Sequence, residues 1–279
     1  MKDYLKLMRV KHWVKNILIF IPLICSGLLN YHNVLLTIGA FFAFSFACSF
    51  IYIINDIRDI EKDKLHPRKK NRPLPSGKIK KQNAIIFSIF LLIISLLINY
   101  FVTRSFNNVS YLFLLGYILI NIGYSFGLKD VAIIDIVILA SGFVIRVYYG
   151  ASIIDVLVSN WLFLTIMSAS LFLGLGKRKK ELINNKESRK VLKEYNEAFL
   201  DKFQYLSLGL TLMFYSLWTI EQKNYLYLTI PLLIVIFMKY CLILEKTDEG
   251  DPTTILYQDK ILLFLSIIYG IAMVIIVVV

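Results

Sequence analysis

The sequence contains few residues of the types that build soft-ligand metal sites. Only three of its 279 residues are cysteines, and Cys25, Cys48 and Cys241 all lie inside apolar runs without metal-type spacing. We therefore interpret them as small core or lipid-facing residues rather than as ligands.

Stretches polar enough to form a water-soluble domain are also lacking. Hydrophobic residues make up 58% of the chain and the mean hydropathy is +0.67, which excludes a water-soluble globular protein. Because there is no separable soluble segment, low-complexity tract or obvious repeat, we expect a single domain over residues 1–279. The basic start runs into an apolar segment without an A-x-A-like cleavage site, which predicts that this segment is retained.

Apolar runs close to the length that crosses a hydrocarbon core, about 20 residues, recur along the chain. They cover roughly residues 16–30, 34–54, 84–102, 110–127, 131–149, 161–176, 203–220, 227–244 and 261–279. The first and sixth runs are short. The sequence thus predicts an all-α, polytopic membrane protein with nine transmembrane helices in one bundle.

Acidic residues are outnumbered, with 19 Asp and Glu against 31 Lys and Arg and a net charge of +12. Except for Arg104, Lys223, Arg146 and Lys239, every Lys and Arg lies in the N-terminal tail or after an even-numbered run. The positive-inside rule places these segments and the N-terminus in the cytoplasm, which predicts a multi-pass protein of the cell (inner) membrane with its active site at the cytoplasmic mouth. Topology and anionic lipid explain the charge, so no nucleic-acid partner is expected.

A cluster of acidic residues follows the second apolar run, in the stretch NDIRDIEKD. Asp56, Asp59 and Asp63 are spaced i, i+3 and i+7, so a helix continuing from the run would present all three on one face. Mg²⁺ is usually held by one or two carboxylates together with substrate phosphates. We interpret the cluster as a Mg²⁺ site for a diphosphate, with Asn55 as a further ligand or hydrogen-bonding group. The alternative is a solvated helix whose acids balance neighbouring basic residues.

The next segment, HPRKKNRPLPSGKIKK, is strongly basic, and its prolines and glycine prevent it from forming one helix. We expect a loop that folds over the acidic cluster and neutralises phosphates, Arg through paired donors and Lys as a point charge. The candidate residues are Arg68, Lys69, Lys70, Arg72 and Lys78. Attraction to anionic lipid explains any single one of them equally well.

Charged residues also lie beside or inside later apolar runs. Lys129 and Asp130 are predicted to form a tight turn, and Asp135 then lies about one helical turn inside the membrane, where a costly ionisable group indicates a site. Arg146 lies about 16 Å further along a helix, at 1.5 Å per residue, so it cannot pair with Asp135. Arg146 either snorkels outward or binds substrate, and Lys239 is expected to snorkel.

The connections after the sixth and eighth runs differ in charge. GLGKRKKE places Lys177 and Arg178 in a basic group before Glu181, which indicates an anion-binding loop with one metal or sugar ligand. The alternative is ordinary positive-inside charge. The last connection is acidic, and Asp251 before Pro252 suits a helix N-cap followed by a first-turn proline. We favour this structural role for Asp251.

These motifs resemble the UbiA superfamily of intramembrane prenyltransferases. The family motif N-D-x-x-D-x-x-x-D is matched by Asn55, Asp56, Asp59 and Asp63, and its Y-S-x-x-L-K element by Tyr124, Ser125, Leu128 and Lys129. The resemblance covers nearly the whole chain. It implies the nine-helix fold of the family and Mg²⁺-dependent transfer chemistry at a diphosphate.

Typical members carry a second acidic motif, D-x-x-x-D, after the sixth helix, but this sequence has GKRKKE there. The replacement resembles the branch of decaprenyl-phosphate phosphoribosyltransferases, as do the stretches RVKHWVKN, NDIRDIEKDKLHPRKKNRPLPSG, YSFGLKDVAIIDIVILASGFVIR and GDPTTILYQDK. The branch implies transfer of 5-phosphoribose from 5-phosphoribosyl 1-diphosphate to a polyprenyl phosphate, which serves cell-envelope biosynthesis.

The chemistry of this reaction agrees with the residues present. A phosphate monoester is already anionic near neutral pH, so the acceptor needs no general base. This fits the scarcity of histidine, since His12 lies in the tail, His32 in an outer connection and only His66 near the acidic motif.

The resemblance also suggests roles for individual residues. Asp56, Asp59 and Asp63 would hold Mg²⁺ on the leaving diphosphate. Lys129, Lys177 and Arg178 would neutralise phosphate charge as the anomeric carbon gains oxocarbenium character, and Glu181 would contact the ribose or the metal. The other substrate-binding candidates are Lys15, Asn55, Arg72, Lys78, Tyr124, Asp135 and Arg146.

Two other functions compete with this interpretation. A prenyltransferase joining a prenyl diphosphate to an aromatic or lipid acceptor would need the second acidic motif, which this sequence lacks. A transporter or lipid-binding protein without catalysis would be expected to show broken helices at the membrane midplane, and that signal is weak here.

Overall fold

The computed structural model describes residues 2–65, 69–184, 190–222 and 225–278, and every secondary-structure element in these ranges is helical. The all-α prediction is therefore confirmed for the described chain. The elements are α1 (Lys2–Leu7), η1 (Val10–Phe20), α2 (Ile21–Cys25), α3 (Tyr31–Arg58), α4 (Ile60–Lys64), η2 (Lys69–Asn71), α5 (Lys81–Thr103), α6 (Ser110–Ser125), η3 (Leu128–Asp130), α7 (Ile134–Ile153), α8 (Asn160–Asn184), η4 (Lys190–Glu194), α9 (Glu197–Glu221), η5 (Tyr225–Thr229), α10 (Ile230–Lys246), α11 (Pro252–Gln258) and α12 (Lys260–Val278).

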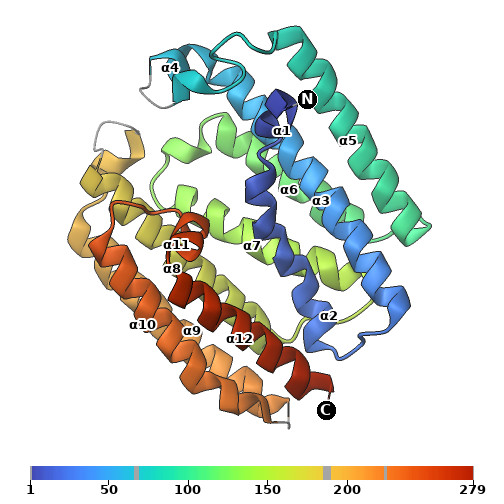
Figure 1. The fold of residues 1–279 in the computed structure, drawn as a ribbon, viewed down its shortest axis with the longest axis vertical. Helices are drawn as coiled ribbons and strands as arrows, with labels where there is room; N and C mark the ends of the chain where they lie inside the picture. The colour runs from blue at the N-terminus through green and yellow to red at the C-terminus, as the bar shows by residue number, and fades with distance from the viewer. Residues whose placement is uncertain (1, 66–68, 185–189, 223–224, 279) are drawn as a thin grey trace.

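Helix α7 lies in the middle of the bundle and contacts α3, α6, α8, η1 and α2. On one side of it α3 packs along α5, and on the other side α8 packs along α9, with α10 and α12 beside them (Figure 1). The N-terminal segment η1 runs close against α7, because a Cβ at Gly150 would lie only 2.1 Å from the Ile19 carbonyl oxygen. Only glycine permits this approach, which holds η1 along the centre of the bundle.

Five described helices are long and apolar enough to cross a membrane. They are Tyr31–Arg58, Lys81–Thr103, Ile134–Ile153, Tyr225–Lys246 and Lys260–Val278. In the apolar 18-residue stretch of each helix, the central helices α3 and α7 bury 56% and 50% of the residues. The three outer helices bury only 22%, 17% and 11%. Outer helices that expose most of their apolar side chains need a lipid environment, so the chain is an integral membrane protein.

The other apolar runs fall on shorter or more charged elements, so the count of nine spans and the orientation stay predictions. The run 110–127 lies in the shorter apolar helix α6. The first run is not one helix, because a 3₁₀ helix up to Phe20 gives way to α2 at Pro22, whose missing N–H favours a helix start.

The prediction of a loop beginning at Lys177 is wrong, since α8 continues to Asn184. Lys, Arg, Glu and Leu are good helix formers, and no proline or glycine interrupts KRKKEL. Arg178 and Glu181, at i and i+3, form an ion pair that supports the continued helix. The basic group therefore lies on a rigid helix, with its side chains directed into the bundle.

Candidate active site at one end of the bundle

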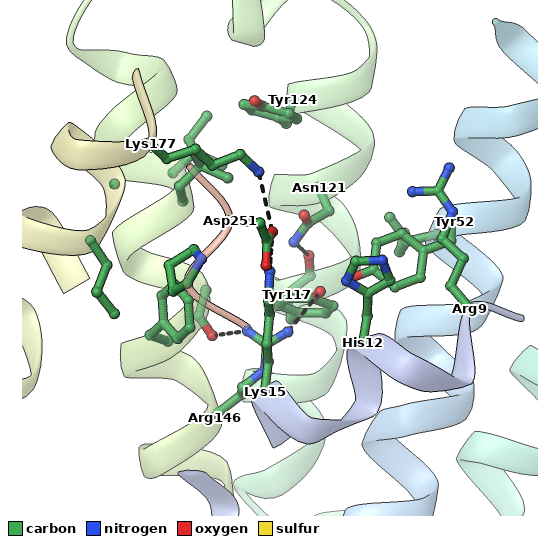
Figure 2. Close-up of a pocket in the computed structure, with 18 of the residues that line it drawn as sticks. Arg9, His12, Lys15, Tyr52, Tyr117, Asn121, Tyr124, Arg146, Lys177 and Asp251 are labelled. Atoms are coloured by element: carbon green, nitrogen blue, oxygen red, sulfur yellow. Dashed lines mark hydrogen bonds and ion pairs between the residues drawn. The ribbon is translucent and has the colours of Figure 1, made fainter. Parts of the chain in front are cut away.

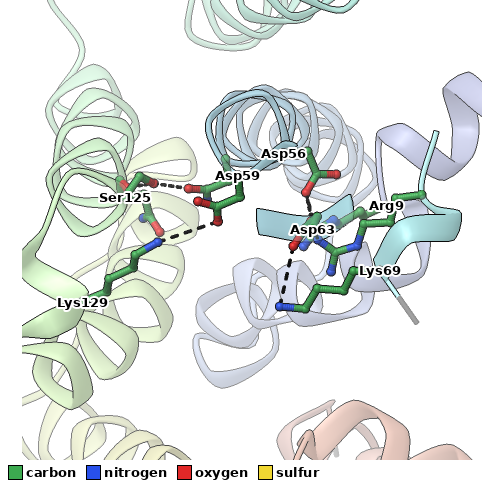
Figure 3. Close-up of polar contacts among 10 residues, drawn as sticks. Arg9, Asp56, Asp59, Asp63, Lys69, Ser125 and Lys129 are labelled. Carbon is green, nitrogen blue, oxygen red and sulfur yellow. Dashed lines mark hydrogen bonds and ion pairs between the residues drawn. The ribbon is translucent and has the colours of Figure 1, made fainter. Parts of the chain in front are cut away.

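Two of the three motif aspartates, Asp56 near the end of α3 and Asp63 on α4, lie close together (Figure 3). One guanidinium joins them. Arg72 donates from Nη1 to Asp63 Oδ2 at 2.7 Å and to Asp56 Oδ1 at 3.2 Å. Arg9 also donates to Asp56, and Lys69 Nζ lies 3.9 Å from Asp63. Because both carboxylates are buried, these cations compensate for their lost hydration.

Asp59 does not share this face, so the prediction of three aspartates on one helical face is wrong. The α-helix ends at Arg58, and Asp59, with φ −93° and ψ 10°, joins it to α4. Figure 3 shows Asp59 directed to the other side, where Lys129 Nζ lies 3.7 Å from its Oδ2. Beside it the Ser125 hydroxyl donates to Asn55, so the two sequence motifs meet here.

A closed protein-only metal site is absent from the described residues, where no three His, Cys, Asp or Glu side chains gather closely enough to hold an ion. The donor set nevertheless fits Mg²⁺, which is usually held by one or two carboxylates and completed by substrate phosphates and water. Asp56 and Asp63 present oxygens to a common point where Arg72 now supplies the positive charge. A cation could replace that guanidinium.

A cavity of about 210 Å³ extends from this end into the bundle (Figure 2). Its polar lining residues are Arg9, His12, Lys15, Tyr52, Asn55, Tyr117, Asn121, Tyr124, Arg146, Lys177 and Asp251. One wall is apolar and comes from α7 and α8, with Ile138, Leu139, Phe143 and Leu173. Arg9 and His12 also line a neighbouring cavity of about 330 Å³ that contains Asp56 and Arg72, so the two spaces adjoin.

The 3₁₀ geometry of η1 brings Arg9, His12 and Lys15 into the cavity. Three residues per turn place side chains at i, i+3 and i+6 on one ridge, whereas an α-helix would rotate them apart. Arg9 precedes the helix in the left-handed region, with φ 53°, and its guanidinium stacks 5.0 Å from the Tyr52 ring. The spacing R-x-x-H-x-x-K was the sequence signal for this ridge, but it has meaning only in a 3₁₀ helix.

Asp251 joins two cations across the cavity. Its Oδ2 lies 3.1 Å from Lys15 Nζ and 3.7 Å from Lys177 Nζ. Its Oδ1 accepts from the Thr253 N–H at 3.0 Å, so the predicted N-cap before Pro252 is confirmed. From the sequence, Asp251 was expected to have only this structural role, because the approach of Lys15 depends on tertiary packing.

Burial and neighbouring charges shift the pKa values of these groups. Burial lowers the pKa of His12 to about 4, and Lys15 adds to the effect, so the imidazole is neutral near pH 7. Burial also lowers the pKa of Lys15, while Asp251 opposes that shift. For Asp251 burial raises the pKa, but Lys15 and Lys177 outweigh it and hold the pKa below its usual range.

Arg146 lies at the inner end of the cavity, and the prediction that it could snorkel outward is wrong. Its Nε donates to Asn16 at 2.8 Å and its Nη2 to the Tyr117 hydroxyl at 3.2 Å. The expected snorkelling of Lys239 stays a prediction, and its Nζ lies 2.9 Å from Asp259 Oδ2.

Arg178 is buried behind the cavity between two carboxylates. Its Nε lies 2.5 Å from Asp135 Oδ2, its Nη1 lies 2.5 Å from Glu181 Oε2, and its Nη2 donates to the Tyr124 hydroxyl at 2.9 Å. Tyr195 donates to the other Asp135 oxygen at 2.6 Å. This network fixes the orientation of Tyr124, which lines the cavity.

The structure thus divides the predicted residues by position. Those at the mouth are Asp56, Asp59, Asp63, Arg72 and Lys129; those lining the cavity are Lys15, Asn55, Tyr124, Arg146 and Lys177; those behind it are Asp135, Arg178 and Glu181. Lys78 is exposed and does not line either cavity. Arg68 and His66 fall outside the described residues. Sequence reasoning missed Arg9, His12, Tyr52, Tyr117 and Asp251 as lining residues.

Comparison with known proteins places the chain in a family. The sequence profile of the UbiA prenyltransferase family matches residues 18–274. A decaprenyl-phosphate phosphoribosyltransferase of Mycolicibacterium smegmatis is 31% identical over 94% of this chain and 89% of that protein. Another, from Corynebacterium glutamicum, is 29% identical over 94% of this chain and 83% of that protein.

A solved structure shows the same fold. A UbiA homologue from Archaeoglobus fulgidus, bound to GPP and Mg²⁺, aligns with a TM-score of 0.72 at 22% identity, covering 98% of this chain and 99% of that one. The profile match spans most of the chain, and the two motifs meet at one end of the bundle. The chain belongs to the UbiA prenyltransferase family.

Proposed function

We propose that this protein transfers 5-phosphoribose from 5-phosphoribosyl 1-diphosphate to a polyprenyl phosphate and releases diphosphate. The observation that carries the proposal is a cation-lined cavity that opens beside a pair of carboxylates suited to Mg²⁺. The relatives named decaprenyl-phosphate phosphoribosyltransferase, which match over 94% of the chain, support the same reaction.

The reaction breaks the bond between the anomeric carbon and the diphosphate oxygen and forms a bond from that carbon to a lipid phosphate oxygen. Asp56 and Asp63 would hold Mg²⁺, which neutralises the leaving diphosphate when it is bound, and Asp59 would face the donor from the other side of α3. Lys129 and Lys177 stabilise phosphate charge as it develops. The lipid phosphate is anionic on arrival, so His12 is not required as a general base.

Other residues act by holding these groups in place. Arg178 fixes Tyr124 at the cavity wall, and Asp135 and Glu181 balance the buried charge of Arg178. Arg72 and Arg9 neutralise the carboxylates until the metal and donor bind. We propose that residues 1–279 form one domain in the cell (inner) membrane, with the mouth facing the cytoplasm, where the donor is dissolved.

Prenyl transfer to an aromatic or lipid acceptor is the alternative, favoured by the similarity in fold to a homologue bound to GPP and Mg²⁺. The described residues at the end of α8 provide GKRKKE, in which Arg178 already pairs with Glu181. They therefore offer no second pair of acids for a metal.

A paired assay of the purified protein with Mg²⁺ tests the proposal. One tube contains radiolabelled 5-phosphoribosyl 1-diphosphate and a polyprenyl phosphate, and the other contains a polyprenyl diphosphate and 4-hydroxybenzoate. We expect label to enter the lipid phase in the first tube only and to be lost with EDTA. A prenylated aromatic product in the second tube alone would replace the proposal with the alternative.

A further inference from the structure

The guanidinium of Arg146 is a permanent charge buried in the bundle interior, with only 5% of the residue exposed. Its hydrogen bonds go to neutral acceptors, namely Asn16 Oδ1, the Gly142 carbonyl, the Tyr117 hydroxyl and the Cys48 sulfur. Three aromatic rings, those of Phe44, Tyr117 and Phe143, lie within 5.7 Å of it. In the described part of the chain no carboxylate forms an ion pair with Arg146. A desolvated cation of this kind favours an anionic partner.

The cavity gives an anion access to this charge. Arg146 lines it together with Lys15 and Lys177, and the two lysines meet at Asp251 (Figure 2). With Arg9, these cations face one lining carboxylate, so the cavity carries excess positive charge. A phosphate monoester, with close to two negative charges near neutral pH, matches that excess.

The depth of Arg146 can be read from the helices around it. Arg146 contacts Cys48 on α3 and Tyr117 on α6, and each lies eight residues before a mouth residue of the same helix, Asp56 and Ser125. Eight residues at 1.5 Å each place the guanidinium about 12 Å below the mouth. The carboxylate pair and Arg146 therefore mark two charged ends of one cavity system.

We propose that Arg146 is the receptor for the 5-phosphate of the donor and thereby selects a phosphoribosyl over a prenyl diphosphate. This inference rests on the proposed function. It assigns the diphosphate of the donor to the mouth of the cavity and the 5-phosphate to the inner end at Arg146. A Mg–O contact of about 2 Å and an N–H···O contact of about 2.8 Å leave roughly 7 Å between the ends. A phosphorylated pentose can span that separation.

The assignment to the 5-phosphate follows from the chemistry. The acceptor phosphate must reach the anomeric carbon, which carries the leaving diphosphate, so acceptor and diphosphate both lie near the mouth. The inner end is then left for the other phosphate of the donor. A prenyl diphosphate has an apolar chain at that position, which would cover the buried guanidinium without supplying a negative charge.

Substrate truncation combined with mutation tests the inference. We would measure kcat/KM for 5-phosphoribosyl 1-diphosphate and for its 5-dephospho analogue, ribosyl 1-diphosphate, with Mg²⁺ and a polyprenyl phosphate. For the wild type we expect loss of the 5-phosphate to cost about 30-fold, equivalent to about 2 kcal/mol at about 1.4 kcal/mol per tenfold. Arg146→Gln should lower kcat/KM for 5-phosphoribosyl 1-diphosphate by about the same factor. The variant should then use the full donor and its 5-dephospho analogue equally well.

Two further variants separate recognition from folding. Arg146→Lys keeps the charge but loses the paired donors, so it should retain part of the discrimination even if Arg146→Gln is unstable. Tyr149→Phe is the matched control, because Tyr149 lies on the same helix as Arg146 and the change removes its buried 2.8 Å hydrogen bond to Asn99 of α5 without touching the cavity. This variant should discriminate as the wild type does.

The outcomes are distinguishable. If Arg146→Gln lowers kcat/KM by the same factor for both donors, Arg146 does not recognise the 5-phosphate. That result would overturn the role of Arg146 and leave the proposed function intact. The same conclusion follows if the wild type uses both donors equally well. A wild type that transfers no phosphoribose would overturn the proposed function and the inference together.

Discussion

The ammonium of Lys129 lies 3.7 Å from Oδ2 of Asp59 and joins the end of α3 to the turn before α7. Asp59 belongs to the acidic motif, and Lys129 belongs to the Y-S-x-x-L-K element. The same two segments also share a hydrogen bond between Asn55 and Ser125, which are 70 residues apart in the sequence. The contact leaves Asp59 on the opposite side from Asp56 and Asp63. The motif therefore supplies two separate charged groups to the mouth.

Asp59→Asn should abolish turnover and leave the protein folded. The Asp59 side chain is 34% exposed, and a partly exposed ion pair contributes at most about 1 kcal/mol to stability, so a larger loss of activity would reflect catalysis. Turnover and thermal unfolding in detergent would be measured together. Glu61→Gln is the matched control, since it makes the same charge change on a well-exposed side chain of α4. Near-normal turnover of Asp59→Asn would show that Asp59 is not part of the catalytic site.

Arg72→Gln should make the protein more dependent on Mg²⁺. Without the guanidinium, Asp56 and Asp63 repel one another, which we expect to cost about 1–2 kcal/mol because Arg72 is only partly buried. Added Mg²⁺ should then raise the Tm of the variant more than that of the wild type, and EDTA should reverse the gain. Equal Mg²⁺ shifts for both proteins would argue against a cation site between these carboxylates.

Arg178→Met should destabilise the protein by about 3–5 kcal/mol, because it leaves Asp135 and Glu181 without their buried partner. Lys179→Met is the control on the same helix. Its partners Asp201 and Glu245 are exposed and stay hydrated, so a loss of about 1 kcal/mol or less is expected. Chemical or thermal unfolding in detergent would compare the two. Similar losses for both variants would mean that the buried ion pairs of Arg178 contribute no more to stability than the more exposed ion pairs of Lys179.

His12 should make the folded state less stable as the pH falls from about 6.5 to about 4. The unfolded chain binds a proton near pH 6.5, whereas the folded chain, with the His12 pKa lowered to about 4, does not, so protonation favours unfolding in this window. His12→Gln removes this contribution, and its Tm should therefore rise relative to the wild type as the pH is lowered. A Tm difference that is constant from pH 7 to pH 4 would contradict the burial of a neutral imidazole.

The local features of this site were largely predictable from the sequence. Asp251 with Pro252 was predicted as a helix cap, and the acidic motif and the Lys129 turn were placed at one end of the bundle, because capping, turns and motif spacing depend on neighbouring residues. Hydrophobic composition and run length likewise indicated a helical membrane protein. Errors arose where helices continue or change type, as at Lys177 and in η1.

The sequence by itself determined the membrane-embedded helical class, the family and the charged end of the bundle, since these follow from hydropathy and from short motifs. Only the tertiary structure decided which charges face each other. Arg9, His12 and Lys15 line the cavity because η1 is a 3₁₀ helix held against α7 at Gly150, and Arg178 turns inward because Asp135 lies opposite it. Such pairings join segments far apart in the chain, and their energies depend on burial and distance, which no local pattern of residues specifies.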